Sequence, residues 1–393
     1  MIKKVSADII ISGDGREWTD HYILLNGSSI EGIYPNSSGN NIDKFAGVIC
    51  PGFVNAHCHL ELSHLLGAID TGTGLIDFIK GVVTLREFPE EIIKEAIITA
   101  DQQMIDNGIV AVGDISNKLD TYEVKESSPI DYYTFVEMFD FLQEDQAQSN
   151  FDQYHEVYQG QSRSGYNRVS CVPHAPYSVS KALFNLINDA NDSDVVVSIH
   201  NQELSAENEL FESKSGGFIG FYKDFGIPLD QFNATGKPSI DYAMSHMNPR
   251  NHTLMVHNTQ TEETDMRRVA QWSDQVYWVT CPNANLYIEN KLPHYKKFIG
   301  SGVKMCIGTD SLSSNWQLSI LDEIKTIKRY QSHVSDRELL KWATYNGAQA
   351  LKYDDRLGSI APGKSPGINL IDVEVSEGNF DLQYARSVRR LDL

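Results

Sequence analysis

Basic side chains are scarce in this chain: 33 Lys and Arg stand against 53 Asp and Glu among 393 residues, giving a formal net charge of −20 at pH 7. Such a charge repels a phosphate backbone and an anionic membrane surface, so neither nucleic acid nor membrane is expected as a partner. No run reaches the roughly 18 apolar residues that a membrane-spanning helix requires. The apolar run within residues 1–11 is too short for a signal peptide, so the expected location is cytoplasmic.

Cysteine is also scarce, with five residues, an odd number, and no Cys-x-x-Cys pair. The cysteines lie mostly in apolar, strand-like runs and are predicted to be reduced core residues. Cys58 stands between two histidines and could serve as a metal ligand, but alternation along a strand points it away from them and favours a core position. The five are Cys50, Cys58, Cys171, Cys281 and Cys306.

An apolar run over residues 48–56 ends in the pair His57 and His59. Two imidazoles one residue apart on a strand point to the same side, so both can bind one metal ion. Alone, such a pair is a weak signal, because surface or core histidines also show this spacing. Three further strand-like runs end in a residue that can bind a metal or move a proton, and these residues are His200, His257 and Asp310.

Strand-like runs alternate with helical stretches from about residue 51 onward, which predicts parallel strands in an α/β protein. Eight such runs suffice to close a TIM-like (β/α)8 barrel. The strand-like runs cover residues 47–57, 108–116, 132–139, 170–175, 195–200, 253–257, 277–282 and 303–310. Helical spacing of apolar residues is clearest at residues 90–107, 181–191, 262–272 and 320–330.

The two ends of the chain differ from this pattern. Residues 1–50 alternate apolar and polar side chains between turn signals, which predicts short antiparallel strands. Residues 357–371 are predicted to form a turn-rich strand pair that completes the N-terminal sheet. We therefore expect residues 1–50 plus 358–393 to form a small β-sandwich domain, and residues 51–357 to form a metal-dependent barrel.

In a barrel of this kind the functional side chains lie at the C-terminal ends of the strands, so residues far apart in sequence converge on one mouth. Three imidazoles and a carboxylate suit one divalent ion, zinc by default, with Fe²⁺ as the alternative. The predicted ligands are His57, His59, His200 and Asp310. A bound ion would lower the pKa of a water molecule, and Asp310 could accept the proton that this water loses. The alternative role for Asp310 is a helix N-cap.

Glu203 and His257 are the predicted acid–base residues of the site. Glu203 follows His200 by three residues and could carry protons to a ring nitrogen; otherwise it is a solvated surface glutamate. His257 could orient the nucleophile or polarise the substrate, with a hydrogen-bonded core histidine as the alternative. No lysine lies within residues 132–139 or 171–176, where barrels that bridge two ions commonly carry one, so a single ion is expected.

Polar residues just past the strand ends are candidates for substrate contact. His174 follows the fourth strand, and Glu61 and Ser63 follow the histidine pair. Packing against neighbouring side chains is an equally weighted alternative for each of them. Asn283 and Asn285, after the seventh strand, allow the same two interpretations.

Five motifs of this chain occur together in one known superfamily. They are Pro51–His59 (PGFVNAHCH), His200-x-x-Glu203, His257, Gly308–Ser311 (GTDS) and Asn346–Ala348 (NGA). On these motifs the chain resembles the amidohydrolase superfamily from Ala7 to about Asp372, and in particular its branch of nucleoside and nucleobase deaminases and triazine hydrolases. The resemblance implies the ligand set given above, with Glu203 as the proton shuttle.

Three longer segments, at residues 59–63, 173–180 and 308–315, are similar to aminodeoxyfutalosine deaminases and their relatives, which deaminate an adenine carried on a modified ribose. The chain departs from that pattern at Gln202, where small residues are usual, and in an insert-like stretch at residues 216–251. Both are expected to border the pocket, so both bear on the choice of substrate.

Together these features predict a hydrolytic deaminase that acts on an aminated purine nucleoside, adenosine-type or aminodeoxyfutalosine, by attack of metal-bound hydroxide. The same site could instead hydrolyse a ring amide, as in imidazolonepropionase-like enzymes, or a chloro-heterocycle, as in triazine hydrolases. A non-catalytic homologue is disfavoured because the complete ligand set is present. The expected partner is a small heterocyclic substrate, and a homodimer is compatible with the sequence.

Overall fold

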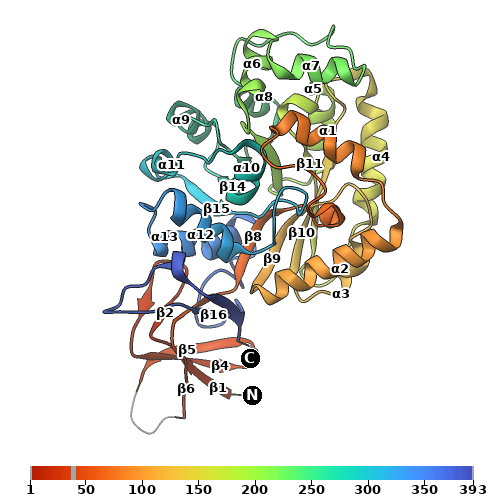
Figure 1. Cartoon of the computed structure of the whole chain (residues 1–393). Coiled ribbons are helices and arrows are strands. Elements are labelled where there is room, and N and C mark those ends of the chain that lie inside the picture. The colour runs from red at the N-terminus through yellow and green to blue at the C-terminus, as the bar shows by residue number, and fades with distance from the viewer. Residues whose placement is uncertain (1, 37–40, 392–393) are drawn as a thin grey trace.

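The structure is a computed structural model that describes residues 2–36 and 41–391. Figure 1 shows a larger upper part, in which helices surround strands, and a smaller lower part built of strands. The first and last described strands, β1 (Ile2–Ser6) and β17 (Ser387–Arg390), both lie in the smaller part. The chain therefore starts and finishes in one module and forms the other in between.

The larger part is an eight-stranded (β/α)8 barrel, as the alternating strands and helices predict. Its strands are almost entirely buried, as expected for parallel strands covered by helices. They form two four-stranded parallel sheets, in the orders β11-β10-β9-β8 and β12-β13-β14-β15. The strands are β8 (Phe53–Cys58), β9 (Ile109–Ile115), β10 (Asp131–Met138), β11 (Arg168–Pro173), β12 (Val196–Asn201), β13 (His252–His257), β14 (Val276–Thr280) and β15 (Lys304–Ile307).

Backbone hydrogen bonds connect the two sheets at both of their seams. At the seam between β15 and β8, the N–H groups of Thr309 and Asp310 donate to the carbonyl of His57 at 3.0 and 2.9 Å. At the other seam, the N–H of His200 donates to the carbonyl of His174 at 2.9 Å. Each seam therefore joins residues that the sequence singles out for chemistry.

The four most clearly predicted helices are all present, as α2, α5, α9 and α12. Two begin at a serine whose hydroxyl caps the helix: Ser180 accepts the N–H of Leu183, and Ser319 accepts the N–H of Asp322. Within the described ranges, no helix is both long enough and apolar enough to cross a membrane. The helices around the barrel are α1 (Leu75–Leu85), α2 (Glu90–Asp106), α3 (Tyr122–Ser127), α4 (Ala147–Gly160), α5 (Lys181–Ala190), α6 (Ser205–Ser213), α9 (Glu263–Trp272), α10 (Pro282–Glu289), α11 (Tyr295–Ser301), α12 (Ile320–Tyr330), α13 (Asp336–Lys341) and α14 (Gly347–Ala350).

The smaller part consists of two sheets that share one apolar core. One sheet has the order β5-β4-β1-β6 and the other β17-β16-β7-β2-β3. Strand β16 pairs with β7 antiparallel, so the C-terminal segment completes the N-terminal sheet as predicted. Buried residues of both sheets, such as Ile23 and Ile49, belong to one cluster. The remaining strands are β2 (Ile9–Ile11), β3 (Glu17–Trp18), β4 (His21–Asn26), β5 (Ser29–Pro35), β6 (Asp43–Lys44), β7 (Val48–Pro51) and β16 (Ile368–Asp372).

The first predicted strand run, residues 47–57, is divided between the two parts. Its first half is β7 in the smaller part, and its second half is β8 in the barrel. The break falls at Gly52, where an added Cβ would lie 2.3 Å from a methyl group of Val110 and 2.8 Å from the carbonyl oxygen of Pro366. Only glycine permits this close approach, so the chain can turn from one sheet into the other there.

The insert-like stretch at residues 216–251 forms two helices, α7 (Gly217–Asp224) and α8 (Ser239–His246). Helix α7 packs its aromatic residues against the loop after β11, where the rings of Phe218 and Tyr177 stack with centroids 4.2 Å apart. This contact anchors the stretch at the C-terminal end of the barrel strands, where functional sites of such barrels lie.

Candidate active site

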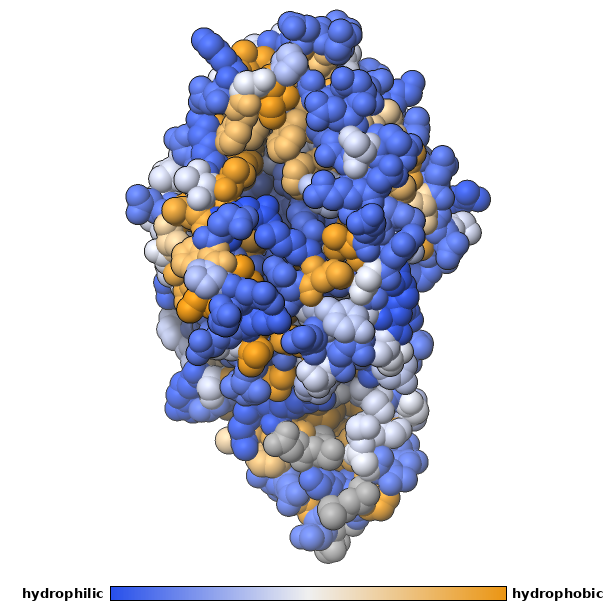
Figure 2. Space-filling model, turned by 90° about the vertical axis from the view of Figure 1, so that its right-hand side faces the viewer, coloured by the Kyte–Doolittle hydropathy of each residue, from blue (hydrophilic) through white to orange (hydrophobic). Residues whose placement is uncertain are grey.

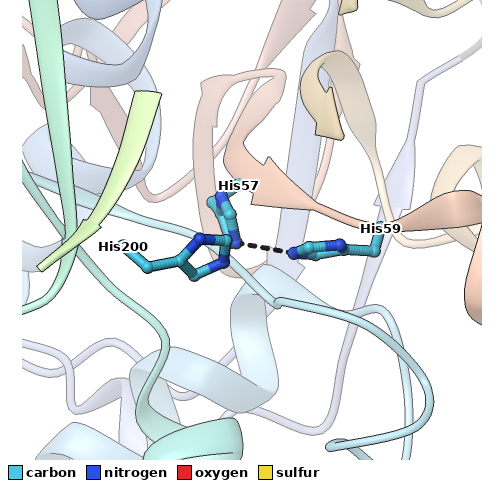
Figure 3. A group of neighbouring side chains, drawn as sticks. All are labelled: His57, His59 and His200. Atoms are coloured by element: carbon cyan, nitrogen blue, oxygen red, sulfur yellow. Dashed lines mark hydrogen bonds between the residues drawn. The ribbon is translucent and has the colours of Figure 1, made fainter. Parts of the chain in front are cut away.

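Three histidines converge at the C-terminal ends of β8 and β12. The Nε2 atoms of His57 and His59 are 3.1 Å apart, and the rings of His57 and His200 lie with centroids 5.0 Å apart (Figure 3). One nitrogen from each ring lies within 4.8 Å of the others. All three side chains are largely shielded from solvent, and His57 is fully buried. The strand alternation expected for the His-x-His pair therefore produces a compact cluster.

Asp310 approaches this cluster from the loop after β15. Its Oδ1 atom is 3.4 Å from Nε2 of His59 and 3.7 Å from Nε2 of His57. The other oxygen, Oδ2, accepts a hydrogen bond of 2.8 Å from the Ser314 hydroxyl. Asp310 does not act as an N-cap, because the next helix begins at Ile320 and is capped by Ser319.

The donor set fits a divalent metal ion. Burial lowers the pKa values of both His57 and His59, so their rings are neutral and present lone pairs. Two neutral imidazole nitrogens that lie 3.1 Å apart beside a buried carboxylate are suited to coordinating one metal ion. His57 Nδ1 has no hydrogen-bond partner in the described structure.

Glu203 is buried beside the three-histidine cluster and is therefore not a solvated surface glutamate. Its Oε2 lies 3.5 Å from Nε2 of His257, and burial raises the pKa of this carboxyl well above its usual value. Two neighbours hold its backbone: Oε1 of Glu207 accepts its N–H at 2.6 Å, and the hydroxyl of Thr259 donates to its carbonyl at 2.6 Å. The carboxyl group is therefore fixed in a dry environment that favours its protonated form.

His257 ends β13 with a positive φ of 74° and lies between two polar partners. The side-chain amide of Asn285 donates to its Nδ1 at 3.0 Å, and its Nε2 faces Glu203. A ring that accepts a hydrogen bond at Nδ1 carries its proton on Nε2. The ring N–H is thus directed toward Glu203 and the interior of the site. Asn285 orients this ring in the structure.

Gln202, the departure from the family pattern, points away from the cluster. Its Oε1 accepts a hydrogen bond of 2.8 Å from the hydroxyl of Thr261, and its Nε2 lies 3.4 Å from Oδ2 of Asp265. Gln202 thus links the loop after β12 to the loop after β13. The larger side chain is accommodated between these loops.

A cavity of about 410 Å³ opens above the cluster. Its base is polar and includes His59, His200, Glu203, His257 and Asp310. Most of its wall is apolar and comes from α1, α7, α10 and neighbouring loops, with Phe78, Ile79, Val82, Phe139, Phe221 and Ile288 among the lining residues. Figure 2 shows hydrophobic side chains gathered around a hollow in the larger part of the molecule.

The three predicted substrate contacts occupy different positions relative to this cavity. His174 and Glu61 both line it. The Nδ1 of His174 lies 2.6 Å from the Ser178 hydroxyl, while Oε2 of Glu61 accepts the N–H of Asn117 at 2.8 Å. Ser63 is not among the lining residues, and its hydroxyl donates to the carbonyl of Leu60 at 2.7 Å.

Glu137 is a site residue that the sequence reasoning passed over. It lies on β10, lines the cavity, and places Oε1 3.3 Å from Nδ1 of His200. A carboxylate in a largely apolar strand, one residue before its end, is the signal that could have identified it, because burying a charge needs a compensating role.

Comparison with known proteins places the chain among enzymes of related architecture. An adenosine deaminase of Helicobacter pylori is 28% identical over 329 residues, which cover 82% of this chain and 78% of that protein. An aminodeoxyfutalosine deaminase of Nitratiruptor sp. is 26% identical over 366 residues, covering 89% of this chain and 85% of that protein.

Solved structures show the same fold. The crystal structure of Helicobacter pylori aminofutalosine deaminase in complex with methylthio-coformycin aligns with a TM-score of 0.80 at 22% identity, covering 99% of this chain and 100% of that chain. An adenosine deaminase from Xanthomonas campestris with bound zinc aligns with a TM-score of 0.74 at 20% identity, covering 98% of this chain and 89% of that chain. Residues 48–390 match the amidohydrolase family, and the chain belongs to that family.

Proposed function

We propose that this protein is a metal-dependent hydrolytic deaminase of an aminated purine nucleoside. The observation that carries the proposal is the buried pair Glu203 and His257 beside the three-histidine cluster, at the base of a cavity large enough for a nucleoside. The similarity to adenosine and aminodeoxyfutalosine deaminases supports the same reaction.

His57, His59, His200 and Asp310 are the residues that would hold the ion, and one ion is proposed. When bound, a divalent ion at this position would make a water molecule more acidic and polarise the bond under attack. Imidazole and carboxylate donors suit zinc, with Fe²⁺ as the alternative. Zinc is favoured because the adenosine deaminase of similar fold from Xanthomonas campestris contains it.

The side chains of the site can then move the protons that deamination requires. Glu203, protonated because burial raises its pKa, donates to the ring nitrogen as water adds to the carbon that carries the amine. Asp310 accepts the proton that the water loses. The amine takes that proton, the carbon–nitrogen bond breaks, and ammonia leaves while the new hydroxyl returns a proton to Glu203. His257, with its N–H directed inward, steadies the attacking oxygen.

The apolar wall favours a nucleoside with a modified ribose over free adenine. A purine above Glu203 and His257 would occupy the polar base, and the remaining cavity is bounded mainly by hydrophobic side chains such as Phe78 and Phe221. A 5′- or 1′-substituent would displace water from these side chains. His174 and Glu61, which line the cavity, stay the proposed polar contacts of the substrate, whereas Ser63 lies outside the cavity lining.

Ammonia release from a panel of substrates tests the proposal. Metal-replete protein should release one ammonia per turnover from an adenine nucleoside, with higher kcat/KM for 5′-modified nucleosides than for adenine. The panel also includes cytosine, guanine, an imidazolone and a chlorotriazine. Hydrolysis of only the last two would favour the ring-amide or chloro-heterocycle alternative instead.

A cytoplasmic location is proposed for the enzyme. All five cysteines are buried and none is paired with another, which suits a reducing compartment. A homodimer is the assembly to test, by light scattering of the purified protein across a range of concentrations.

A further inference from the structure

One oxygen of Glu137 is buried and lacks a hydrogen-bond donor, and the residue lines the cavity. The side chain is only 4% exposed, and Oε1 accepts no hydrogen bond within the described structure. The other oxygen, Oε2, has only a long contact of 3.4 Å from the side-chain amide of Asn117. A buried acceptor without a donor is costly, and a ligand that supplies one would remove the cost.

The neighbouring histidine does not supply this donor. Nδ1 of His200 lies 3.3 Å from Oε1 of Glu137, but it also lies 2.9 Å from the carbonyl oxygen of His174. One N–H cannot serve both acceptors well, and the carbonyl is the closer. The Glu137 oxygen is therefore left for a group that enters the cavity.

A second metal ion does not suit this position. Glu137, His174 and His200 offer ligand atoms within 4.8 Å of one another. However, Nδ1 of His200 is bonded to the His174 carbonyl, and its ring also belongs to the three-histidine cluster. Only two protein ligands would remain, fewer than a stable site for a divalent ion requires.

The position of Glu137 around the barrel indicates which part of a nucleoside meets it. Among the reacting groups, Glu203 and Asp310 follow β12 and β15, and His257 ends β13. Glu137 lies on β10 in the other four-stranded sheet. Glu137 and His174 both line the cavity on that side. A nucleoside with its amine-bearing ring above Glu203 can extend its sugar toward this side of the cavity.

We propose that Glu137 accepts a hydrogen bond from a ribose hydroxyl and thereby selects ribonucleosides over deoxyribonucleosides. This inference rests on the proposed deaminase function and adds to it a specificity-determining residue. A carboxylate only accepts hydrogen bonds, so a hydroxyl is a matching partner and a carbonyl or a second anion is not.

Kinetics with matched substrates test this role. The wild type and Glu137→Gln are compared on adenosine, 2′-deoxyadenosine and 3′-deoxyadenosine. The wild type should prefer adenosine by about 10- to 100-fold in kcat/KM over the analogue that lacks the contacted hydroxyl, as expected for a hydrogen bond to a charged group. Glu137→Gln should lose most of this preference by slowing adenosine alone, and Glu123→Gln, at an exposed position on α3, should retain it.

A purely structural role would give a different result. If Glu137 only supported His200, Glu137→Gln would slow all three nucleosides equally and lower the metal content. That outcome, or an unchanged preference for adenosine, would overturn the role of Glu137 while leaving deamination intact. A second variant, Glu137→Ala, removes the carboxylate acceptor without introducing the amide group of glutamine.

Binding of the reaction products distinguishes a failure of this inference from a failure of the proposed function. Calorimetry with inosine, 2′-deoxyinosine and 3′-deoxyinosine repeats the comparison without turnover. Tighter binding of inosine to the wild type, lost in Glu137→Gln, supports the hydroxyl contact even if the physiological nucleoside is none of those assayed. If the wild type binds no nucleoside and deaminates none, both the function and the contact are wrong.

Discussion

Three residues at the ends of barrel strands adopt positive φ angles although none is glycine. The φ values are 46° for Gln202, 74° for His257 and 59° for Asp310. This left-handed conformation is unfavourable for ordinary side chains and is retained where the surroundings impose it. Here it turns the chain sharply after β12, β13 and β15. The side chains of His257 and Asp310 consequently lie in the mouth of the barrel.

Replacing Glu203 by Gln should separate proton transfer from metal binding. The amide has almost the same shape, but it cannot deliver the proton that the ring nitrogen needs. We expect kcat to fall by about 10²- to 10⁴-fold. Metal content, measured by elemental analysis, should not change. Glu209→Gln, at an exposed position on α6, is the matched control, and near-normal turnover of Glu203→Gln would remove this residue from the mechanism.

Replacing His59 by Ala should reduce metal content and activity together. The purified wild type is expected to contain about one equivalent of a divalent ion, since the four predicted ligands form one cluster. Loss of His59 removes an imidazole whose Nε2 is 3.1 Å from that of His57. His155→Ala, at a partly exposed position on α4, serves as the control. Two equivalents of metal in the wild type, or full retention in His59→Ala, would contradict a single site.

At the residue scale, the sequence identifies those site residues that end a strand within a recognisable motif. The cluster of His57, His59 and His200 is of this kind. Glu137 is not, because it lies inside a strand and no spacing links it to another polar residue. Its contact with the cavity depends on how β10 sits beside β11, which is a property of the assembled sheet.

At the scale of elements, one buried carboxylate connects two loops of the site. Oε2 of Glu323, on α12, accepts the backbone N–H of Asn283 at 2.8 Å, and its Oε1 accepts the Asn315 amide at 2.7 Å. Asn283 is the second residue of α10, the helix that carries Asn285 against His257. The amide of Asn315 also donates to the carbonyl of Thr309 at 2.8 Å, next to the predicted metal ligand.

We expect Glu323→Gln to lower kcat while the protein stays folded. The amide nitrogen of glutamine would face a donor, either Asn283 or Asn315, and leave that donor without a partner. A small displacement of both loops should reduce kcat by about 10- to 100-fold, because reacting groups tolerate little misplacement. Circular dichroism checks the fold, and Asp322→Asn, the neighbouring partly exposed residue, is the control. Unchanged kcat in Glu323→Gln would mean that α12 does not position these loops.

The elements themselves are predicted to different degrees. Strand–helix alternation is a local pattern, so all eight barrel strands are anticipated from the sequence. The division of the first run at Gly52 is not, because it depends on contact with Val110 and Pro366 far along the chain. The sequence of residues 216–251 likewise indicates only an insert and does not predict its two helices. The position of helix α7 depends on the contact between Phe218 and Tyr177, which lie far apart in the sequence.

At the scale of the whole molecule, the predicted metal ligands span the seam at which the barrel closes. His57 and His59 belong to the first barrel strand and Asp310 follows the last, while His200 comes from the opposite sheet. The protein itself joins the first and last strands by two N–H donors, from Thr309 and Asp310, to the carbonyl of His57. An ion held by all four ligands would add a cross-link between the two sheets.

Removal of the metal should therefore lower the melting temperature of the whole barrel as well as abolish activity. An ion present at 100 times its Kd stabilises the folded state by about 2.7 kcal/mol, provided that the unfolded chain does not bind it. For a domain of this size that corresponds to roughly 3–4 °C. Differential scanning fluorimetry of chelated and metal-replete protein measures the shift.

His59→Ala should melt at the same temperature with and without chelator, since it lacks a ligand. If chelation removes activity from the wild type but leaves its melting temperature unchanged, the ion serves the chemistry without holding the seam, and closure of the barrel depends on the backbone hydrogen bonds and packing alone.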